Sequence, residues 1–365
     1  MNSEICYIYP IYNRVSFHYI AKKHIEYLSN YVRVHEIDEN VLDHLMWANR
    51  KNIIIHPALY PLVGSSIYSY QKKIHRLPKL LNVKKRLGGF EVADTNRVSE
   101  IAVKVLNEFD VIFVPSKFSK QVLEESGVTT EVEVIPHGLP NSFLKSDRNI
   151  TDKTLLELKE LKESRGYIYV LHFLLHSGFR KGSDLVAKVM GKIQSEFDNV
   201  ILVVKRERLI DPFIHQLRKL KMIEIDAWFD EDGLRQLYDL SDIVLVPSRG
   251  GGFELNAIEA IARGIPTVVP NAGCFLDYIQ YTIPVKVGRW VKVFSDNIVH
   301  VGEGHECDLL DLYEKLTEVI ENLDKYKRKF SRYAKTIRKK YTWEKTGELL
   351  LKYLEEYGFL NGTGV

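Results

Sequence analysis

The sequence has 365 residues, of which 45% are hydrophobic and 27% charged, and its formal net charge is +3. This length exceeds the usual size of one hydrophobic core, so we expect two domains. The slight net charge gives no general affinity for nucleic acid, and the three widely spaced cysteines fit neither a disulfide framework nor a zinc site. No apolar run approaches the ~18 residues of a membrane span, and the first residues lack the form of a signal peptide. These features predict a globular, cytoplasmic protein.

The first half of the chain alternates short apolar runs with helical patterns, which is typical of an α/β domain. His56 follows one predicted strand directly, at the end where open α/β sheets bind ligands, and His137 follows another. Both are candidates for an acceptor or cleft site, and a hydrogen-bonded core or surface histidine is the alternative. The strands are expected at 5–9, 32–37, 52–55, 110–114 and 131–135, with helices at 16–30 and 115–127.

Two segments are rich in lysine and arginine. Residues 71–87 interleave cations with apolar residues, which fits either a membrane-surface or anionic-acceptor patch or a solvated amphipathic face. Residues 325–341 keep apolar residues at helical spacing, which indicates a packed helix with a basic outer face. Nucleic-acid binding is the alternative for the second segment, but no recognition motif accompanies it. We therefore predict possible peripheral membrane contact and no nucleic-acid partner.

The second half repeats the α/β pattern after a polar boundary at residues 145–165. Asp230 and Asp232 open one of its helices, where acidic side chains cap the free N–H groups. A metal–nucleotide site at these two residues is the alternative. The expected strands are 167–175, 199–204, 222–229 and 283–287, and the expected helices are 211–220 and 306–323.

Residues 241–270, SDIVLVPSRGGGFELNAIEAIARGIPTVVP, predict a strand, a glycine turn, a helix and a strand. The glycines permit positive φ and close approach of the backbone to a ligand. The turn leads into a helix N-terminus, whose free N–H groups and dipole suit phosphate. Glu254 and Glu259 follow, and ionised carboxylates accept hydrogen bonds from sugar and ribose hydroxyls. We therefore predict a ligand in which a diphosphate is joined to sugars.

This stretch resembles the donor-site signature of retaining GT-B glycosyltransferases of the family-4-like group. Their pattern is roughly P-S-x-x-E-G-F-G-L-x-x-x-E-A-x-A-x-G-x-P, and this chain has PSRGGGFELNAIEAIARGIP. The first glutamate of the family, which holds the donor sugar, falls on Gly251, and the second glycine falls on Glu254. The second glutamate, which holds the nucleotide ribose, is kept as Glu259. The resemblance therefore implies a ribose contact at Glu259 and makes Glu254 the candidate for a sugar contact from a shifted place.

Other segments extend the resemblance over most of residues 88–358. DVIFVPSKFSKQVLEESGV and the following VEVIPHGL are similar to the element before the second domain of the family, and the cations of Arg180-Lys181-Gly182 match those that hold the donor diphosphate. Adjacent cations on a loop are otherwise usually solvent-exposed. Trp228 falls where relatives place the nucleobase. The implied donor-binding set is Arg180, Lys181, Gly182, Trp228, Ser248, Gly250, Gly251, Gly252, Phe253, Leu255 and Glu259.

Residues 88–100 match a family segment that ends a strand facing the inter-domain cleft, where many members have a histidine. This chain has Glu91 and Asp94 there instead. With Glu254 they are the candidate catalytic carboxylates. A turn or helix-capping role is the alternative for Asp94.

The resemblance implies a GT-B α/β fold of two Rossmann-like domains facing across a cleft. The expected domains are 1–150 for the acceptor, 151–341 for the nucleotide-sugar, and 342–365 as a helix crossing back to the first domain. The implied reaction is retaining, hexosyltransferase-type transfer from a nucleoside diphosphate sugar to a glycan, lipid-linked or protein acceptor, without a metal or other cofactor. The alternatives are a sugar-nucleotide epimerase, a phosphorylase, for which no pyridoxal phosphate signal is present, and a nucleotide-sugar-binding subunit without turnover.

Overall fold

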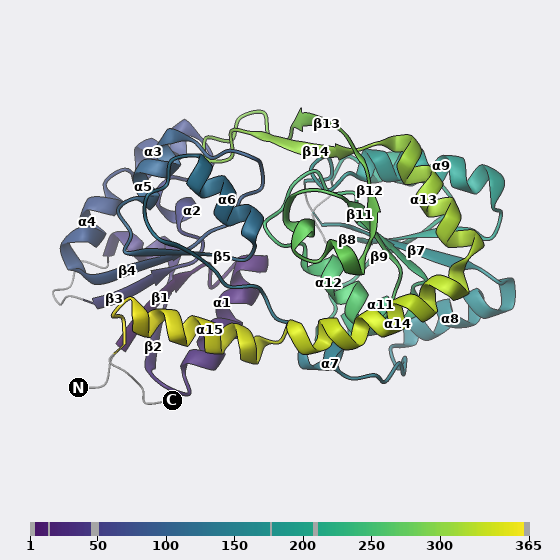
Figure 1. Ribbon diagram of the computed structural model, residues 1–365, viewed down its shortest axis with the longest axis horizontal. Helices are drawn as coiled ribbons and strands as arrows, with labels where there is room; N and C mark the ends of the chain where they lie inside the picture. Colours follow the sequence, from purple (N-terminus) through teal and green to yellow (C-terminus); the bar gives the residue numbers. More distant parts are fainter. Residues whose placement is uncertain (1–3, 14, 45–50, 176, 207–210, 361–365) are drawn as a thin grey trace. The chain divides into compact units, whose positions relative to one another are not determined.

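The computed structural model describes residues 4–13, 15–44, 51–175, 177–206 and 211–360. The chain divides into unit 1, which comprises Met1–Gly138, Phe294–Glu303 and Tyr341–Val365, and unit 2, which comprises Leu139–Val293 and Gly304–Lys340. Within the described residues each unit contains one six-stranded sheet with helices packed on it (Figure 1). These units differ from the predicted domains 1–150, 151–341 and 342–365, because the first boundary falls at Gly138 and Phe294–Glu303 returns to unit 1.

The sheet of unit 1 is parallel throughout, in the order β2-β1-β3-β4-β5-β6. Successive side chains point to opposite faces, and both faces are buried. One face packs on α5 and α6, the other on α1 and α15. The strands are β1 Glu4–Tyr9, β2 Arg33–Asp38, β3 Lys51–Ile55, β4 Lys84–Phe90, β5 Val111–Val114 and β6 Val132–Val134; the helices are α1 Ser16–Leu28, η1 Glu39–His44, α2 Leu59–Leu62, α3 Ile67–Lys73, α4 Arg76–Val83, α5 Glu100–Leu106, α6 Lys117–Glu125 and α15 Trp343–Glu356.

The sheet of unit 2 is also parallel, in the order β12-β11-β10-β7-β8-β9. The strand order reverses between β7 and β10, and α/β sheets bind ligands at the carboxyl ends of the strands at such a point. The strands are β7 Ile168–Leu174, β8 Val200–Arg206, β9 Met222–Asp226, β10 Ile243–Leu245, β11 Thr267–Pro270 and β12 Ile283–Val285; the helices are α7 Asn141–Leu144, α8 Lys153–Arg165, α9 Ser183–Glu196, α10 Ile214–Leu217, α11 Glu231–Leu240, α12 Leu255–Ala262, η2 Gly273–Asp277, η3 Ile279–Tyr281, α13 Leu309–Glu321 and α14 Leu323–Lys340.

The structure differs from the sequence prediction mainly at element ends and in one added sheet. The strand expected at 222–229 ends at Asp226, because Asp230 caps α11 by accepting a hydrogen bond from Gly233 N. A two-stranded sheet of β13 (Val287–Lys292) and β14 (Glu303–Cys307) was not predicted. No helix in the described part of the chain combines the length and apolarity that crossing a membrane requires.

Candidate functional site

Two loops of unit 2 meet where its strand order reverses. β7 and β10 pair in parallel, so the loops that follow them leave the same edge of the sheet. Gly182 lies in the first loop and begins α9 with a φ of 73°. A Cβ at Gly182 would lie 2.2 Å from the carbonyl oxygen of Pro247 in the second loop. Glycine is therefore required here both by its conformation and by the close approach of the two loops.

Charged side chains connect these loops. Lys181 Nζ donates to Glu254 Oε1 at 2.6 Å, and Ser248 Oγ donates to the same oxygen at 2.8 Å. The side chain of Lys181 is 22% exposed and that of Glu254 only 3%. Arg180 Nη1 donates to the carbonyl oxygen of Gly250 at 2.9 Å. The two predicted diphosphate-binding cations therefore lie against the glycine turn, and in this structure Lys181 is held by a carboxylate.

The exchange of residue types at positions 251 and 254 has a spatial explanation. A Cβ at Gly251 would lie 2.3 Å from Glu254 Oε1, so the carboxylate of Glu254 occupies the space into which a side chain at 251 would start. Glu254 is the N-cap residue of α12 and has a φ of 59°, a left-handed conformation that is uncommon outside glycine. The carboxylate of Glu254 therefore lies beside residue 251, the position at which the family pattern has its first glutamate.

Glu259 lies on the first turns of α12 and is 7% exposed. Its Oε2 accepts a hydrogen bond of 2.8 Å from the hydroxyl of Tyr238 on α11. Burial raises the pKa of Glu259 to about 7, although the Tyr238 hydrogen bond acts in the opposite direction. Burial is the main cause that raises the pKa of Tyr238, and the charges of Glu259 and Glu254 raise it further, so both carboxylates lie within electrostatic range of this phenol.

Several supporting residues were not identified from the sequence. Arg249 is fully buried, and its guanidinium donates to Asp184 at 2.6 and 2.8 Å and to Glu306 at 2.8 Å. These contacts fasten the glycine turn to α9 and β14. His305 on β14 is 2% exposed; its ring bonds to the Ser248 carbonyl, and its Nε2 has no partner among the described residues. Burial lowers its pKa to about 4, so the ring is neutral at pH 7.

Arg249 and His305 could not be identified from the sequence, for different reasons. An arginine before three glycines has the pattern of a solvent-exposed loop residue, and only Asp184 in the first turn of α9 hints at its partner. His305 belongs to the unpredicted β13–β14 sheet, so no periodicity indicated its position.

The remaining predicted donor residues occupy distinct surroundings. Ser248 and Phe253 are buried, and Leu255 opens α12 half-buried. Trp228 follows β9 and is 63% exposed, which suits stacking on a planar ligand. Asp230 caps α11, and the carboxylate of Asp232 forms an ion pair with Arg235 at 2.8 Å. Capping and pairing account for these two aspartates.

Glu91 and Asp94 follow β4 in unit 1. Glu91 is 1% exposed and accepts hydrogen bonds from the backbone N–H groups of Leu59 and Val92 at 2.8 and 3.0 Å. Burial raises its pKa to about 7. Asp94 is half-buried in the loop before α5, which Ser99 caps. Glu91 therefore anchors the loop after β3, and a catalytic role for either carboxylate stays a prediction.

The two predicted acceptor-site histidines lie in one buried cluster of unit 1, which also contains His24 of α1. Tyr7 Oη hydrogen-bonds His24 Nδ1 at 2.9 Å and His56 Nδ1 at 3.1 Å. The His137 ring lies 6.2 Å from that of Trp343, and burial lowers the pKa of His137 to about 3. Burial likewise lowers the pKa of His24 and His56 far below the usual value. All three rings are therefore neutral at pH 7, and each has one nitrogen that can donate and one that can accept a hydrogen bond from a hydroxyl group.

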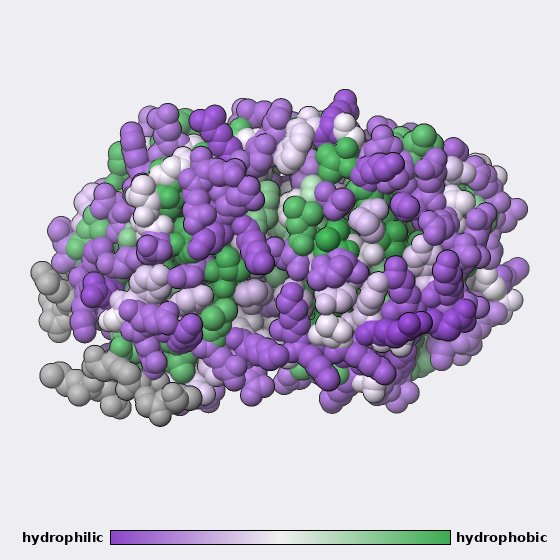
Figure 2. Space-filling view, in the orientation of Figure 1, coloured by the Kyte–Doolittle hydropathy of each residue, from purple (hydrophilic) through white to green (hydrophobic). Residues whose placement is uncertain are grey.

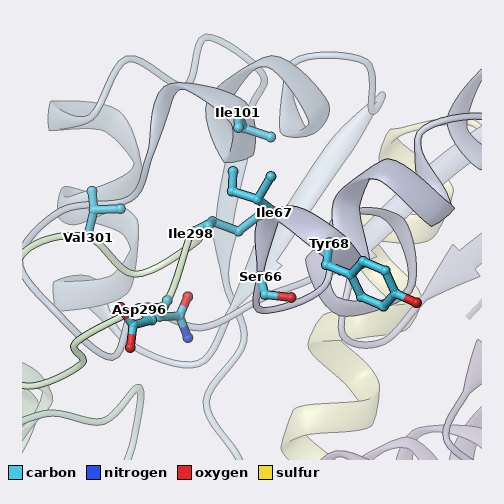
Figure 3. Close-up of a pocket in the computed structure, with 8 residues that line it drawn as sticks. Ser66, Ile67, Tyr68, Ile101, Asp296, Ile298 and Val301 are labelled. Carbon is cyan, nitrogen blue, oxygen red and sulfur yellow. The ribbon is translucent and has the colours of Figure 1, made fainter.

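A cavity of about 590 Å³ in unit 1 contains none of the predicted site residues (Figure 3). Ile67, Ile101, Ile298 and Val301 give it an apolar lining, and Asn297 uses its side-chain oxygen to accept from two backbone N–H groups. This cavity offers no paired titratable groups, so it is not the candidate site.

Sequence comparisons point to one enzyme class. The family described as "Family 4 Glycosyltransferase in conflict systems" matches residues 180–350. The chain is 27% identical to "Uncharacterized protein 356" of Sulfolobus islandicus rod-shaped virus 1, over 98% of this chain and 99% of that protein. It is 29% identical to "Putative glycosyltransferase 45" of a Sulfolobus islandicus filamentous virus, over 74% of this chain and 70% of that protein.

Two solved structures are similar to this chain over nearly its whole length. Anabaena HepE in complex with UDP and glucose superposes with a TM-score of 0.70 at 12% identity, covering 97% of this chain and 100% of HepE. The sucrose-phosphate synthase of Thermosynechococcus elongatus gives a TM-score of 0.65 at 14% identity, covering 97% of this chain and 98% of that one. With its two parallel sheets, the chain has the GT-B fold of two Rossmann-like domains.

Proposed function

We propose that this chain is a GT-B glycosyltransferase of the family-4-like group that moves a hexosyl group from a nucleoside diphosphate sugar to an acceptor hydroxyl with retention of configuration. One observation carries the proposal: Lys181 from the loop after β7 and Glu254 from the loop after β10 meet at 2.6 Å where the sheet order of unit 2 reverses. A cation beside a carboxylate on a glycine turn suits a ligand that has a diphosphate at one end and hydroxyl groups at the other.

Each part of the donor is assigned a partner. Lys181, Arg180 and the backbone N–H groups of Gly182 and the glycine turn hold the diphosphate. Glu259 accepts hydrogen bonds from the ribose hydroxyls, and Glu254 accepts them from the transferred sugar. Trp228, exposed after β9, stacks on the nucleobase. The complexes of HepE with UDP and glucose, and with UDP-glucose, support a uridine nucleotide as the first donor to test.

The chemistry follows from where charge develops. As the bond between the anomeric carbon and the phosphate oxygen breaks, negative charge grows on the departing nucleoside diphosphate. In this proposal Lys181, Arg180 and the N-terminal dipoles of α9 and α12 stabilise that charge, and fixed dipoles of this kind lower the barrier without reorganising. We propose that these groups make a metal ion unnecessary and that the departing phosphate takes the proton from the acceptor hydroxyl.

The acceptor is assigned to unit 1. His56 and His137 lie at the carboxyl end of its parallel sheet, where they offer neutral hydrogen-bonding groups to hydroxyls. Asp94 is the other candidate at this edge. A glycan, a lipid-linked sugar and a protein side chain can each supply the acceptor hydroxyl, and we propose only that the acceptor is a hydroxyl group.

Release of nucleoside diphosphate from UDP-, GDP-, ADP- and TDP-sugars tests the proposed function, with EDTA present throughout. We expect turnover of one donor, an α-linked product from an α-linked donor by proton NMR, and loss of turnover in Lys181→Ala. Binding of a donor without any turnover would identify a binding subunit, and a donor converted to its epimer would identify an epimerase. Turnover lost in EDTA and restored by manganese would contradict metal independence.

A further inference from the structure

One face of α14 carries a continuous stripe of cations. The helix has nine lysines and arginines and a single aspartate between residues 323 and 340. At 3.6 residues per turn, its exposed cations fall within a sector of roughly 140° and span roughly 22 Å of helix. The opposite side packs through Phe330, Ala334 and Ile337, which are buried. The exposed cations, here called the α14 stripe, are Lys325, Arg328, Lys329, Arg332, Lys335, Lys339 and Lys340.

Among the described residues, local acids do not neutralise the first five cations of this stripe, which run from Lys325 to Lys335. The two remaining cations of the helix serve packing, since Lys327 pairs with Asp242 at 2.6 Å and Arg338 donates to the Ala262 carbonyl at 2.7 Å. In the described part of the chain, none of the first five stripe residues has a carboxylate within ion-pair distance. Arg148, which donates to the Arg263 carbonyl, adds an exposed cation beside the helix.

The other basic segment, residues 71–87, differs in that four of its eight basic residues are paired locally with a carboxylate. His75 and Arg76 share Asp43 at 2.7 and 2.8 Å, and Arg86 and Lys84 lie 3.7 and 3.6 Å from Asp110. Asp43 and Asp110 therefore offset part of the positive charge of this segment.

Charge in the chain is strongly segregated. The net charge is +3, and α14 alone contributes +8, so all other residues together carry −5. A surface charged only for solubility would spread its cations among acids. Concentration on one helix face instead creates a local positive potential that attracts polyanions. Figure 2 shows the surface over this helix in the deep purple of hydrophilic residues.

We propose that the α14 stripe docks the protein on an anionic membrane surface. Clusters of four to eight cations on one side of a helix are attracted to anionic lipid headgroups. The apolar residues of α14 are used in packing, so contact is electrostatic and at headgroup level, without insertion. The stripe contains no exposed aromatic side chain on which nucleic-acid bases could stack, which favours a lipid surface over single-stranded nucleic acid.

Co-sedimentation with vesicles tests this proposal independently of any glycosyl transfer. The wild-type protein should bind vesicles of phosphatidylglycerol mixed with phosphatidylcholine, release from them at high salt, and fail to bind phosphatidylcholine alone. The triple variant Arg328→Gln, Arg332→Gln and Lys335→Gln keeps good helix formers at exposed positions. Its affinity should fall by about fivefold per cation, the factor that corresponds to about 1 kcal/mol, and so by roughly a hundredfold in total.

A matched control removes three cations from the other basic segment, in the variant Lys72→Gln, Lys79→Gln and Lys85→Gln. This control should bind the mixed vesicles within about twofold of wild type, since ~0.4 kcal/mol is within the scatter of such measurements. Equal losses in both triple variants would overturn the assignment to α14. Binding to duplex DNA or RNA in the absence of vesicle binding would overturn the lipid partner and identify a nucleic acid instead. Circular dichroism of each variant checks that the fold is kept.

Discussion

The pairing of Lys181 with Glu254 predicts that one substitution, Glu254→Gln, changes the affinities for UDP and UDP-glucose in opposite directions. In the structure the lysine is held at 2.6 Å by a carboxylate that is only 3% exposed. A nucleoside diphosphate must draw Lys181 away from that carboxylate. Glu254→Gln removes the competing charge, so free UDP should bind the variant more tightly than it binds wild type. UDP-glucose should bind less tightly, because the sugar hydroxyls lose a charged acceptor.

The structure sets the size of both effects. Hydrogen bonds to charged groups contribute about 1.5–3 kcal/mol, which is roughly tenfold to a hundredfold in affinity. Loss of the sugar contact should weaken UDP-glucose binding by that factor. The gain for free UDP should be smaller, about 1 kcal/mol, because Lys181 is partly exposed and its release from the pair is screened by water. Ser248 Oγ, which now donates to Glu254, can donate equally to the amide oxygen of the variant.

Isothermal titration calorimetry with UDP and with UDP-glucose measures both constants. Glu157→Gln is the matched control, since it makes the same charge change on an exposed residue of α8 in the same unit. The control should leave both affinities unchanged. If Glu254→Gln weakened the binding of UDP and of UDP-glucose equally, two inferences would be refuted: the contact of Glu254 with the sugar, and the competition between Glu254 and the diphosphate for Lys181.

Three further predictions test the donor loops. Burial raises the pKa of Glu259 to about 7 from an unfolded value of 4.5, so the folded state holds the proton more tightly and this residue lowers stability as the pH rises from 4.5 to 7. Glu259→Gln should therefore raise the free energy of unfolding at pH 8 by about 3 kcal/mol in urea titrations, and it should weaken UDP binding. In wild type, the affinity for UDP should fall as the pH drops below 7. A variant that is less stable than wild type at pH 8 would contradict this reasoning. Gly251→Ala places a Cβ 2.3 Å from Glu254 Oε1 and should weaken UDP-glucose binding more than UDP binding in calorimetry. An unchanged ratio of the two affinities would show that a side chain at residue 251 does not displace the Glu254 carboxylate. Arg249→Met leaves the half-buried Asp184 without its cation and Glu306 with Arg289 alone. It should lower the free energy of unfolding in urea by about 3 kcal/mol, and a change below ~1 kcal/mol would show that the glycine turn does not depend on this network.

Local sequence patterns were sufficient to predict the two α/β halves, whereas the donor loops were assigned from the family resemblance. Alternating apolar runs indicated the parallel strands, and the glycine turn between β10 and α12 indicated a loop whose backbone can approach a ligand closely. No local pattern predicted the close approach of Gly182 to Pro247 between the two loops. Capping also operates over one turn of chain, which is why Asp230 could be placed at the start of a helix.

Features that depend on distant parts of the chain could not be predicted. Arg249 is balanced by Asp184, 65 positions earlier, and by Glu306, 57 positions later, and no local pattern connects them. The return of Phe294–Glu303 to unit 1 depends on backbone pairing such as that between Val98 and His300. The position of the Glu254 carboxylate required the backbone conformation of the turn, because a helical wheel alone places residues 254 and 259 on different faces.

The central claim is that the donor diphosphate binds between the loops after β7 and β10 of unit 2. A crystal structure with a fluorinated, unreactive UDP-hexose tests it most directly. The account predicts a diphosphate within hydrogen-bond distance of Lys181 and of the glycine-turn N–H groups, with Glu259 on the ribose and Glu254, no longer bonded to Lys181, on the sugar. A diphosphate bound elsewhere, or a Lys181–Glu254 pair that stays intact beside the bound donor, would contradict it.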